Sequence, residues 1–176
     1  MKTIVQKDTP AGKALRDIAK PVTKSEIKTP KFKALLKDME SALASQHDGV
    51  ALAAPQLGVA KRLFVISPII FSTSPNASTL VFINPTIVKK SNDKKKMEEG
   101  CLSVRGVYGV VRRSSRVTVE AMDAKGEIFQ MNGAGLLAQI FQHEIDHLEG
   151  ILFTDKGQDF HEIDMEVIKK RFAKKK

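Results

Sequence analysis

Near its C-terminal end the chain reads Gln142-His143-Glu144-Ile145-Asp146-His147-Leu148-Glu149-Gly150, directly after an apolar run from Leu136 to Phe141. The pattern predicts a buried helix on which His143 and His147 share one face, about 5–6 Å apart at Cβ. Both imidazoles can then bind one metal ion, with Glu144 beside them to act on water. Buried imidazoles and carboxylates are costly unless they are paired or bind a metal. A metal-binding helix is therefore favoured over a surface helix with chance spacing.

Two histidines leave such a site short of a third protein ligand. The downstream candidates are Glu149, His161 and Glu162, and none is set apart by its surroundings. Upstream, Cys101 is the single cysteine of the chain and lies in a turn of small residues. A thiolate at this position, together with both histidines, would complete a tetrahedral site that keeps one position open.

The composition is ordinary for a soluble globular protein. The 176 residues are 42% hydrophobic and 28% charged, which suits one domain over residues 1–176 with a full core. No stretch approaches the ~20 apolar residues of a membrane span, and the N-terminus lacks the apolar run of a signal peptide. A cytoplasmic location is therefore expected, and the single cysteine excludes an intrachain disulfide.

The formal net charge of +9 indicates affinity for a polyanion. Much of this charge lies in Lys94-Lys95-Lys96 and in the tail from Lys169 to Lys176. The alternative is that each run is only a solvated face, as most charge runs are.

Two further helices are expected. Thr29 at the N-cap and Pro30 at the first helical position begin an amphipathic helix over residues 30–46. Residues 160–176 become steadily more basic and are expected to form a C-terminal helix.

Apolar, β-branched runs predict buried strands bounded by proline and other turn residues. They lie at 62–67 and 80–84, with 87–88 continuing the sheet as far as the lysine run, and a hairpin spans 117–131. The fold class is therefore α+β, with antiparallel sheets packed around the central metal-binding helix.

Small residues are dense from Gly49 to Gly58, where backbone can approach another chain or a ligand closely. Gln56 is a polar amide in this apolar neighbourhood. Two interpretations stay open from the residues alone: a structural amide bonded to a nearby loop, or a donor directed at a substrate oxygen.

The three stretches Gly49–Gln56, Glu99–Ser103 and Gln142–His147 resemble, in order and spacing, the three signature motifs of peptide deformylases. The resemblance extends from Ala19 to Phe153 and so covers most of the chain. It implies an amide hydrolase that removes the N-formyl group from the N-terminal formylmethionine of newly made polypeptides.

The resemblance also implies roles for single residues. Cys101, His143 and His147 would bind one divalent metal, natively Fe²⁺, while Zn²⁺, Ni²⁺ or Co²⁺ can occupy the same ligands. Glu144 would be the general base and later the general acid. The Gln56 side chain and the Leu102 backbone N–H would stabilise charge on the formyl oxygen.

By the same resemblance, the substrate peptide lies extended along main chain near Val50, Ala51 and Gly100, as an added β-strand. The side chains expected to line the methionine pocket are Val50, Met97, Glu99, Leu136, Gln139 and Ile140. A contact between Glu99 and Arg113 is expected, the alternative being a solvated arginine.

Four positions depart from the usual family pattern. Ala51 stands for a glycine, Gln139 for an aliphatic residue, Tyr108 for an arginine that binds the peptide backbone, and Arg105 for a proline. None is a metal ligand or the base, so these departures bear on substrate preference and catalytic efficiency. Ala51 in particular is expected to crowd the passing substrate backbone.

The implied partners are N-formylmethionyl nascent peptides and the ribosome near its exit tunnel, bound through the basic C-terminal helix. No membrane or DNA partner is expected, and a mature eukaryotic form would work in an organellar matrix.

Three rival interpretations remain. A zinc peptidase shares the His-Glu-x-x-His motif but needs a carboxylate or histidine third ligand and should tolerate loss of Cys101. A basic RNA- or ribosome-binding protein with a structural metal needs a fourth ligand, for which the chain offers no candidate. A catalytically weak homologue that binds formyl peptides would follow from Ala51 and Gln139.

Overall fold

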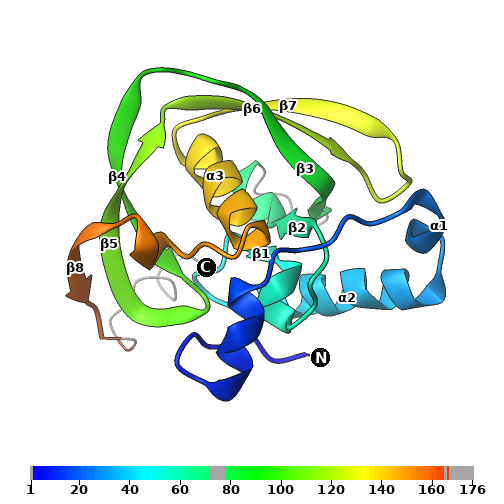
Figure 1. Cartoon of the computed structure of the whole chain (residues 1–176), viewed down its shortest axis with the longest axis horizontal. Coiled ribbons are helices and arrows are strands. Elements are labelled where there is room, and N and C mark those ends of the chain that lie inside the picture. Colours follow the sequence, from blue (N-terminus) through cyan, green and yellow to red (C-terminus); the bar gives the residue numbers. More distant parts are fainter. Residues whose placement is uncertain (1, 72–77, 165, 167–176) are drawn as a thin grey trace.

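The computed structural model describes residues 2–71, 78–164 and 166 and has two antiparallel sheets around one buried helix (Figure 1). The five-stranded sheet has the order β1-β2-β3-β6-β7, with β1 Ala51–Ala53, β2 Leu63–Ile66, β3 Leu80–Lys90, β6 Arg116–Met122 and β7 Ile128–Ala134. The three-stranded sheet has the order β4-β5-β8, with β4 Lys94–Cys101, β5 Val104–Ser114 and β8 Gln158–Glu162. The α+β architecture expected from the sequence is confirmed.

The α-helices of the described chain are α1 Lys24–Ile27, α2 Pro30–Ala44 and α3 Leu136–Leu148. Short 3₁₀ helices occupy Pro10–Arg16, Ala54–Leu57, Pro68–Ile70 and Phe153–Asp155. None of these described helices is both long enough and apolar enough to cross a membrane.

The predicted start of α2 is confirmed by its cap. Thr29 Oγ1 accepts a hydrogen bond from the Phe32 backbone N–H at 3.2 Å, and Pro30 occupies the first turn. This satisfies an N–H that would otherwise have no partner within the helix. The helix then buries Phe32, Met39 and Leu43 in an apolar cluster with Leu52 of β1.

The central helix α3 is packed against the large sheet at its middle and is ended by a glycine. Phe141 packs edge-on against Phe82, with ring centroids 5.3 Å apart, and Gly133 lies so close that a Cβ there would be 2.9 Å from the Phe141 ring. Gly150 ends the helical segment with φ +71, a conformation that favours glycine. These contacts fix where the polar face of α3 points.

Strand β3 continues through Pro85, although the sequence predicts that the strand starting at residue 80 ends at residue 84. Asn84 has φ +50, and the register with β6 shifts between Ile83 and Thr86, so the strand bends at a bulge. The Asn84 side chain accepts from Val22 N and donates to Val22 O, both at 2.8 Å. The bulge removes the need for a ladder hydrogen bond from proline.

The expectations for the two basic segments have different outcomes. The five-stranded sheet extends as far as the lysine run, as expected, because β3 ends at Lys90. The lysine run itself begins β4, an edge strand of the three-stranded sheet on which exposed lysines are well tolerated. The C-terminal helix does not begin at residue 160, because Gln158–Glu162 pairs with β5 as β8 and Phe160 packs on Gly109 and Phe153. The remainder of that expected helix lies almost wholly outside the described residues.

Candidate active site

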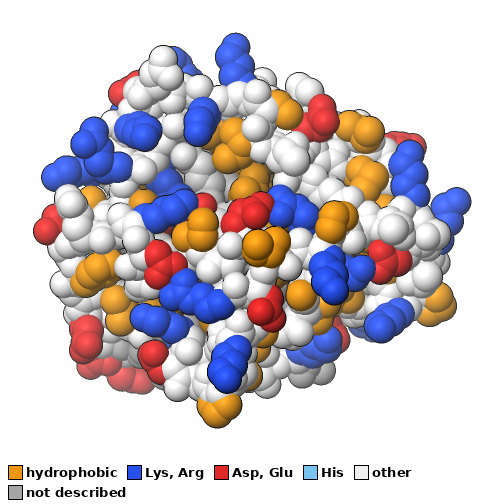
Figure 2. All heavy atoms as spheres, viewed as in Figure 1, with side chains coloured by type: hydrophobic (Ala, Val, Ile, Leu, Met, Phe, Trp, Pro, Cys, Tyr) orange, Lys and Arg blue, Asp and Glu red, His pale blue; other side chains and the backbone are white. Residues whose placement is uncertain are grey.

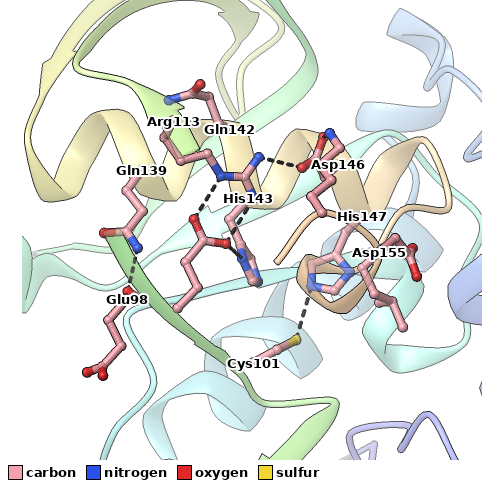
Figure 3. Close-up of polar contacts among 12 residues, drawn as sticks. Glu98, Cys101, Arg113, Gln139, Gln142, His143, Asp146, His147 and Asp155 are labelled. Carbon is pink, nitrogen blue, oxygen red and sulfur yellow. Dashed lines mark hydrogen bonds and ion pairs between the residues drawn. The ribbon is translucent and has the colours of Figure 1, made fainter. Parts of the chain in front are cut away.

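Cys101, His143 and His147 form one cluster whose ligand atoms all lie within 4.8 Å of one another. Cys101 ends β4, and the histidines lie one turn apart on α3, so the cluster joins the small sheet to the central helix (Figure 3). Cys101 Sγ lies 3.2 Å from His147 Nε2. The fold thus selects Cys101 as the third member and leaves Glu149, His161 and Glu162 outside the cluster.

His143 is oriented by a buried carboxylate. Its Nδ1 lies 3.0 Å from Glu99 Oε2, which leaves Nε2 for the cluster. The expected contact between Glu99 and Arg113 is confirmed: Nε donates to Oε1 at 2.8 Å and Nη2 to Oε2 at 2.9 Å. Glu99 therefore holds the histidine ring through one oxygen while both oxygens bind the guanidinium.

The same arginine extends this chain of charges toward the surface. Arg113 Nη1 donates to Asp146 Oδ2 at 2.5 Å, and Lys156 Nζ donates to Asp146 Oδ1 at 2.6 Å. Sequence reasoning did not single out Asp146, although its place between the two histidines was a usable signal. The buried guanidinium is thus shared between two carboxylates.

The charge states suit a metal site. Burial alone would raise the pKa of Glu99, but Arg113 and His143 lower it to about 2, so it is a carboxylate. Burial also opposes ionisation of Cys101, yet the neighbouring His147 and His143 hold the pKa of this thiol well below its usual value. A thiolate is the form of cysteine that binds metal.

The donor set fits a divalent ion of intermediate softness. One thiolate and two imidazoles are the ligands that Zn²⁺ and Fe²⁺ accept, and three ligands leave a position free. Within the described chain, Glu144 Oε2 and His147 Nδ1 are buried side-chain atoms with no hydrogen-bond partner. Unpartnered polar atoms beside a cluster of ligands are expected where water or substrate enters.

Glu144 is buried and lines a cleft that it shares with Cys101 and His143. Burial raises the pKa of this carboxyl to about 6, the neighbouring histidine charges opposing the effect. A group that titrates near neutrality can both take up and release a proton.

The Gln56 side chain is locked with its amide nitrogen toward the thiol. Its Oε1 accepts from Ala53 N at 2.8 Å, while Nε2 donates to Ser103 Oγ at 3.2 Å and contacts Cys101 Sγ at 3.6 Å. Both interpretations of Gln56 thus have support, because a structural bond at one end aims the donor at the other. Ser103 was missed by sequence reasoning, although it lies within the second motif.

A cleft of about 240 Å³ opens beside the cluster, between β1 and β4, each of which is an edge strand of its sheet. The expected substrate-binding residues that line it are Val50, Ala51, Glu99, Gly100, Tyr108, Leu136, Gln139 and Ile140, and Leu102, the expected N–H donor, lines it as well. Met97 does not line it, because its partner in the sheet is Val111, two residue pairs beyond Glu99.

Two departures from the family pattern tie neighbouring segments together. Gln139 Nε2 donates to Glu98 O at 2.7 Å, so this amide fastens α3 to β4 (Figure 3). Arg105 Nη1 donates to both Asp48 carboxylate oxygens at 2.9–3.0 Å across the cleft wall. These polar side chains are therefore paired within the protein.

The other two departures are packed. Ala51 is 6% exposed and belongs to the same apolar cluster as Ile66 and Ile140, although it also lines the cleft. The Tyr108 ring covers Gly100 so closely that a Cβ there would lie 2.6 Å from the ring. Tyr108 also stacks on His161, with ring centroids 6.1 Å apart.

Comparison with known proteins agrees with this geometry. A family model described as Polypeptide deformylase matches residues 1–162. Peptide deformylase 2 of Clostridium acetobutylicum is 43% identical over 80% of this chain and 87% of its own length. The peptide deformylase of Halothermothrix orenii is 46% identical over 81% and 86%.

Solved structures give the same result. A peptide deformylase from Synechococcus elongatus, in complex with actinonin, superposes with a TM-score of 0.80 at 35% identity, covering 90% of this chain and 81% of the other. One from Legionella pneumophila has a TM-score of 0.77 at 37% identity, covering 99% and 94%.

Proposed function

The chain belongs to the polypeptide deformylase family, metal-dependent enzymes that remove the N-formyl group from new polypeptides, and we propose that Cys101, His143 and His147 hold its metal ion. The convergence of their ligand atoms within 4.8 Å is the observation that carries this assignment. Fe²⁺ is the proposed native ion, and Zn²⁺, Ni²⁺ or Co²⁺ should fill the same ligands on isolation.

Glu144, Gln56 and Leu102 each have a proposed role in hydrolysis. When bound, the ion supplies Lewis-acid polarisation and lowers the pKa of a coordinated water to about 7 in favourable sites. Glu144 takes up a proton in the cleft and later delivers it to the departing amine. The Gln56 amide and the Leu102 N–H donate to the formyl oxygen as it gains charge. Loss of one such donor costs roughly 2.7–4 kcal/mol of transition-state stabilisation in other enzymes.

The substrate peptide is proposed to lie between the two sheets. β1 and β4 are each an edge strand of their sheet, so an extended chain can pair with main chain on either side of the cleft. Val50, Ala51, Gly100 and Tyr108 would contact the peptide. Leu136, Gln139, Ile140 and the stem of Glu99 would surround the methionine side chain, with Met97 further from the cleft.

The direct test is turnover of a formyl-Met tripeptide by protein purified anaerobically with Fe²⁺. Release of formate from this peptide, with no cleavage of the unformylated tripeptide, is the expected result. Cleavage of the peptide bonds themselves would instead support the peptidase interpretation.

Cys101→Ser is expected to release the metal. A serine hydroxyl is a poor ligand beside two imidazoles, so affinity should fall by more than the roughly 10–100-fold that loss of an outer-shell partner causes. The check is metal content after dialysis against a graded chelator, with Cys101→Asp as a variant that retains an anionic donor. Undiminished metal retention in Cys101→Ser would favour a peptidase-type ligand set.

Ala51→Gly is expected to raise kcat/KM for formyl-Met peptides, because the methyl group narrows the cleft beside β1. Glycine in a strand should also cost about 0.5–1 kcal/mol of stability, which thermal unfolding would report. An unchanged or lower kcat/KM would argue against crowding by Ala51.

The basic C-terminal tail is proposed to dock on the ribosome in the cytoplasm, near emerging nascent chains, through RNA phosphate. Truncation after Asp164 leaves β8 intact and removes this tail. The truncated chain should sediment with ribosomes less well than the full chain, with a weaker salt dependence. Equal, salt-insensitive sedimentation of both chains would exclude this role.

A further inference from the structure

Seven exposed cations gather where β3, β4, β5 and β6 meet; Figure 2 shows this margin of the molecule at the upper left. We call this set the β3–β4 basic surface, and it comprises Lys89, Lys90, Lys94, Lys95, Lys96, Arg112 and Arg116. Within the described residues, none of the seven forms an ion pair. Asp93, in the turn between β3 and β4, is the one acidic residue within residues 89–97 and 112–116.

The strand register forces these charges together. Lys96 lies directly opposite Arg112 in the β4–β5 pair, and like charges in that position are destabilising. Backbone hydrogen bonds join the turn between β3 and β4 to the junction of β5 and β6: Ser91 N donates to Arg116 O and Ser115 N to Asp93 O, both at 2.9 Å. An anion bound across these strands would turn the mutual repulsion into attraction.

The same surface contains a groove of about 460 Å³. It is lined by Lys89, Lys90, Ser91, Arg116, Val117, Thr118, Asn132, Gly133 and Ala134. Six of these nine residues have a cationic, hydroxyl or amide side chain, and none of the nine is aromatic. Such a lining suits phosphate oxygens and sugar hydroxyls, which are the groups most often bound in nucleic-acid backbones.

We propose that the β3–β4 basic surface binds the phosphate backbone of RNA. The groove shares no residue with the catalytic cleft, so RNA bound here leaves the cleft open to a peptide. Membrane binding would need large apolar side chains beside the cations, and Val88 is the one such exposed residue on these strand ends in the described chain. Because the substrates are new polypeptides, ribosomal RNA is the source to which the proposal commits.

The test uses the full-length, metal-loaded chain and a fluorescein-labelled RNA hairpin, followed by anisotropy over a range of salt concentrations. The variant combines Lys89→Gln, Lys90→Gln and Lys96→Gln. The matched control combines Lys31→Gln, Lys33→Gln and Lys37→Gln, which removes equal charge from exposed positions of α2. Both variants should turn over a formyl-Met tripeptide at the wild-type rate.

The surface variant should bind the hairpin at least ~10-fold more weakly at low salt, with a log–log salt slope reduced by up to about 3, since each lost phosphate contact removes about 0.9. The control should remain close to wild type, and ribosome sedimentation should follow the hairpin result. An equal loss of hairpin affinity in both variants would mean that binding depends only on the net charge of the protein, and this would overturn the proposal. It would also be overturned by an unchanged surface variant, or by equally strong binding to poly-glutamate or phosphatidylglycerol vesicles.

Discussion

Glu144→Ala is expected to lower kcat for a formyl-Met tripeptide by about 10²–10⁴-fold, the usual contribution of a positioned acid–base group. The carboxyl is buried, one of its oxygens has no partner in the described chain, and burial raises its pKa to about 6. Of the other carboxylates that line the cleft, Glu99 is engaged by Arg113 and Asp48 by Arg105. Glu98, which is exposed and lies 3.5 Å from His161 Nε2, is therefore the one lining carboxylate that could replace the base in the alanine variant.

The measurement is kcat together with metal content and the thermal unfolding midpoint of the same preparation. Glu144→Gln is the matched control, because it keeps the side-chain shape and removes only the ability to transfer a proton. Both variants should retain the metal and lose turnover to a similar extent. A Glu144→Gln enzyme within about twofold of wild type would rule out Glu144 as the base, since proton transfer is worth far more. Glu98→Gln should retain wild-type turnover.

Arg113→Met is expected to lower the free energy of unfolding by about 3–5 kcal/mol. The guanidinium is buried and binds both oxygens of Glu99, which is itself buried. Without it, an uncompensated carboxylate remains in the core, and that is the costly way to break a buried pair. Release of Glu99 should also loosen His143 and weaken metal binding, because Glu99 Oε2 holds the imidazole Nδ1.

Two variants separate these effects. Arg112→Met, at the exposed neighbouring position, should change stability by no more than about 0.5 kcal/mol. The double variant Arg113→Met with Glu99→Leu should recover most of the lost stability, since apolar replacements of buried pairs are often neutral. It should not recover metal affinity, because His143 would still lack its carboxylate. Recovery of both properties in the double variant would mean that Glu99 does not position His143.

Several features of the fold were predictable because they depend on short-range chemistry. Thr29 and Pro30 mark the start of α2, Gly150 marks the end of α3, and the hairpin turn is encoded by Asp123 to Gly126. The four-residue spacing of His143 and His147 likewise places both rings on one face of a helix. In each case the backbone preference of a few neighbouring residues decides the outcome.

Strand β4 and strand β8 were not predictable in the same way. Lysine has a low preference for strands, so the run at Lys94 does not predict a strand, and the basic composition after residue 160 predicts a helix where β8 lies. Both segments are strands because β5 lies between them and offers hydrogen-bond partners on each side. Pairing with a distant strand here outweighs local propensity.

By itself, the sequence determined the helix that carries His143 and His147 and the α+β class, and through the family motifs it predicted Cys101, His143 and His147 as metal ligands. Only the tertiary structure decided that Gln139 is tied to Glu98 O, that Arg105 pairs with Asp48, and that the cleft lies between β1 and β4. It also decided that Lys96 faces Arg112. The physical reason is the sequence separation of the interacting residues. A helix cap or a pair of histidines on one helix face involves residues only a few positions apart. Buried polar pairs and facing charges depend on the register of strands that are far apart in the chain.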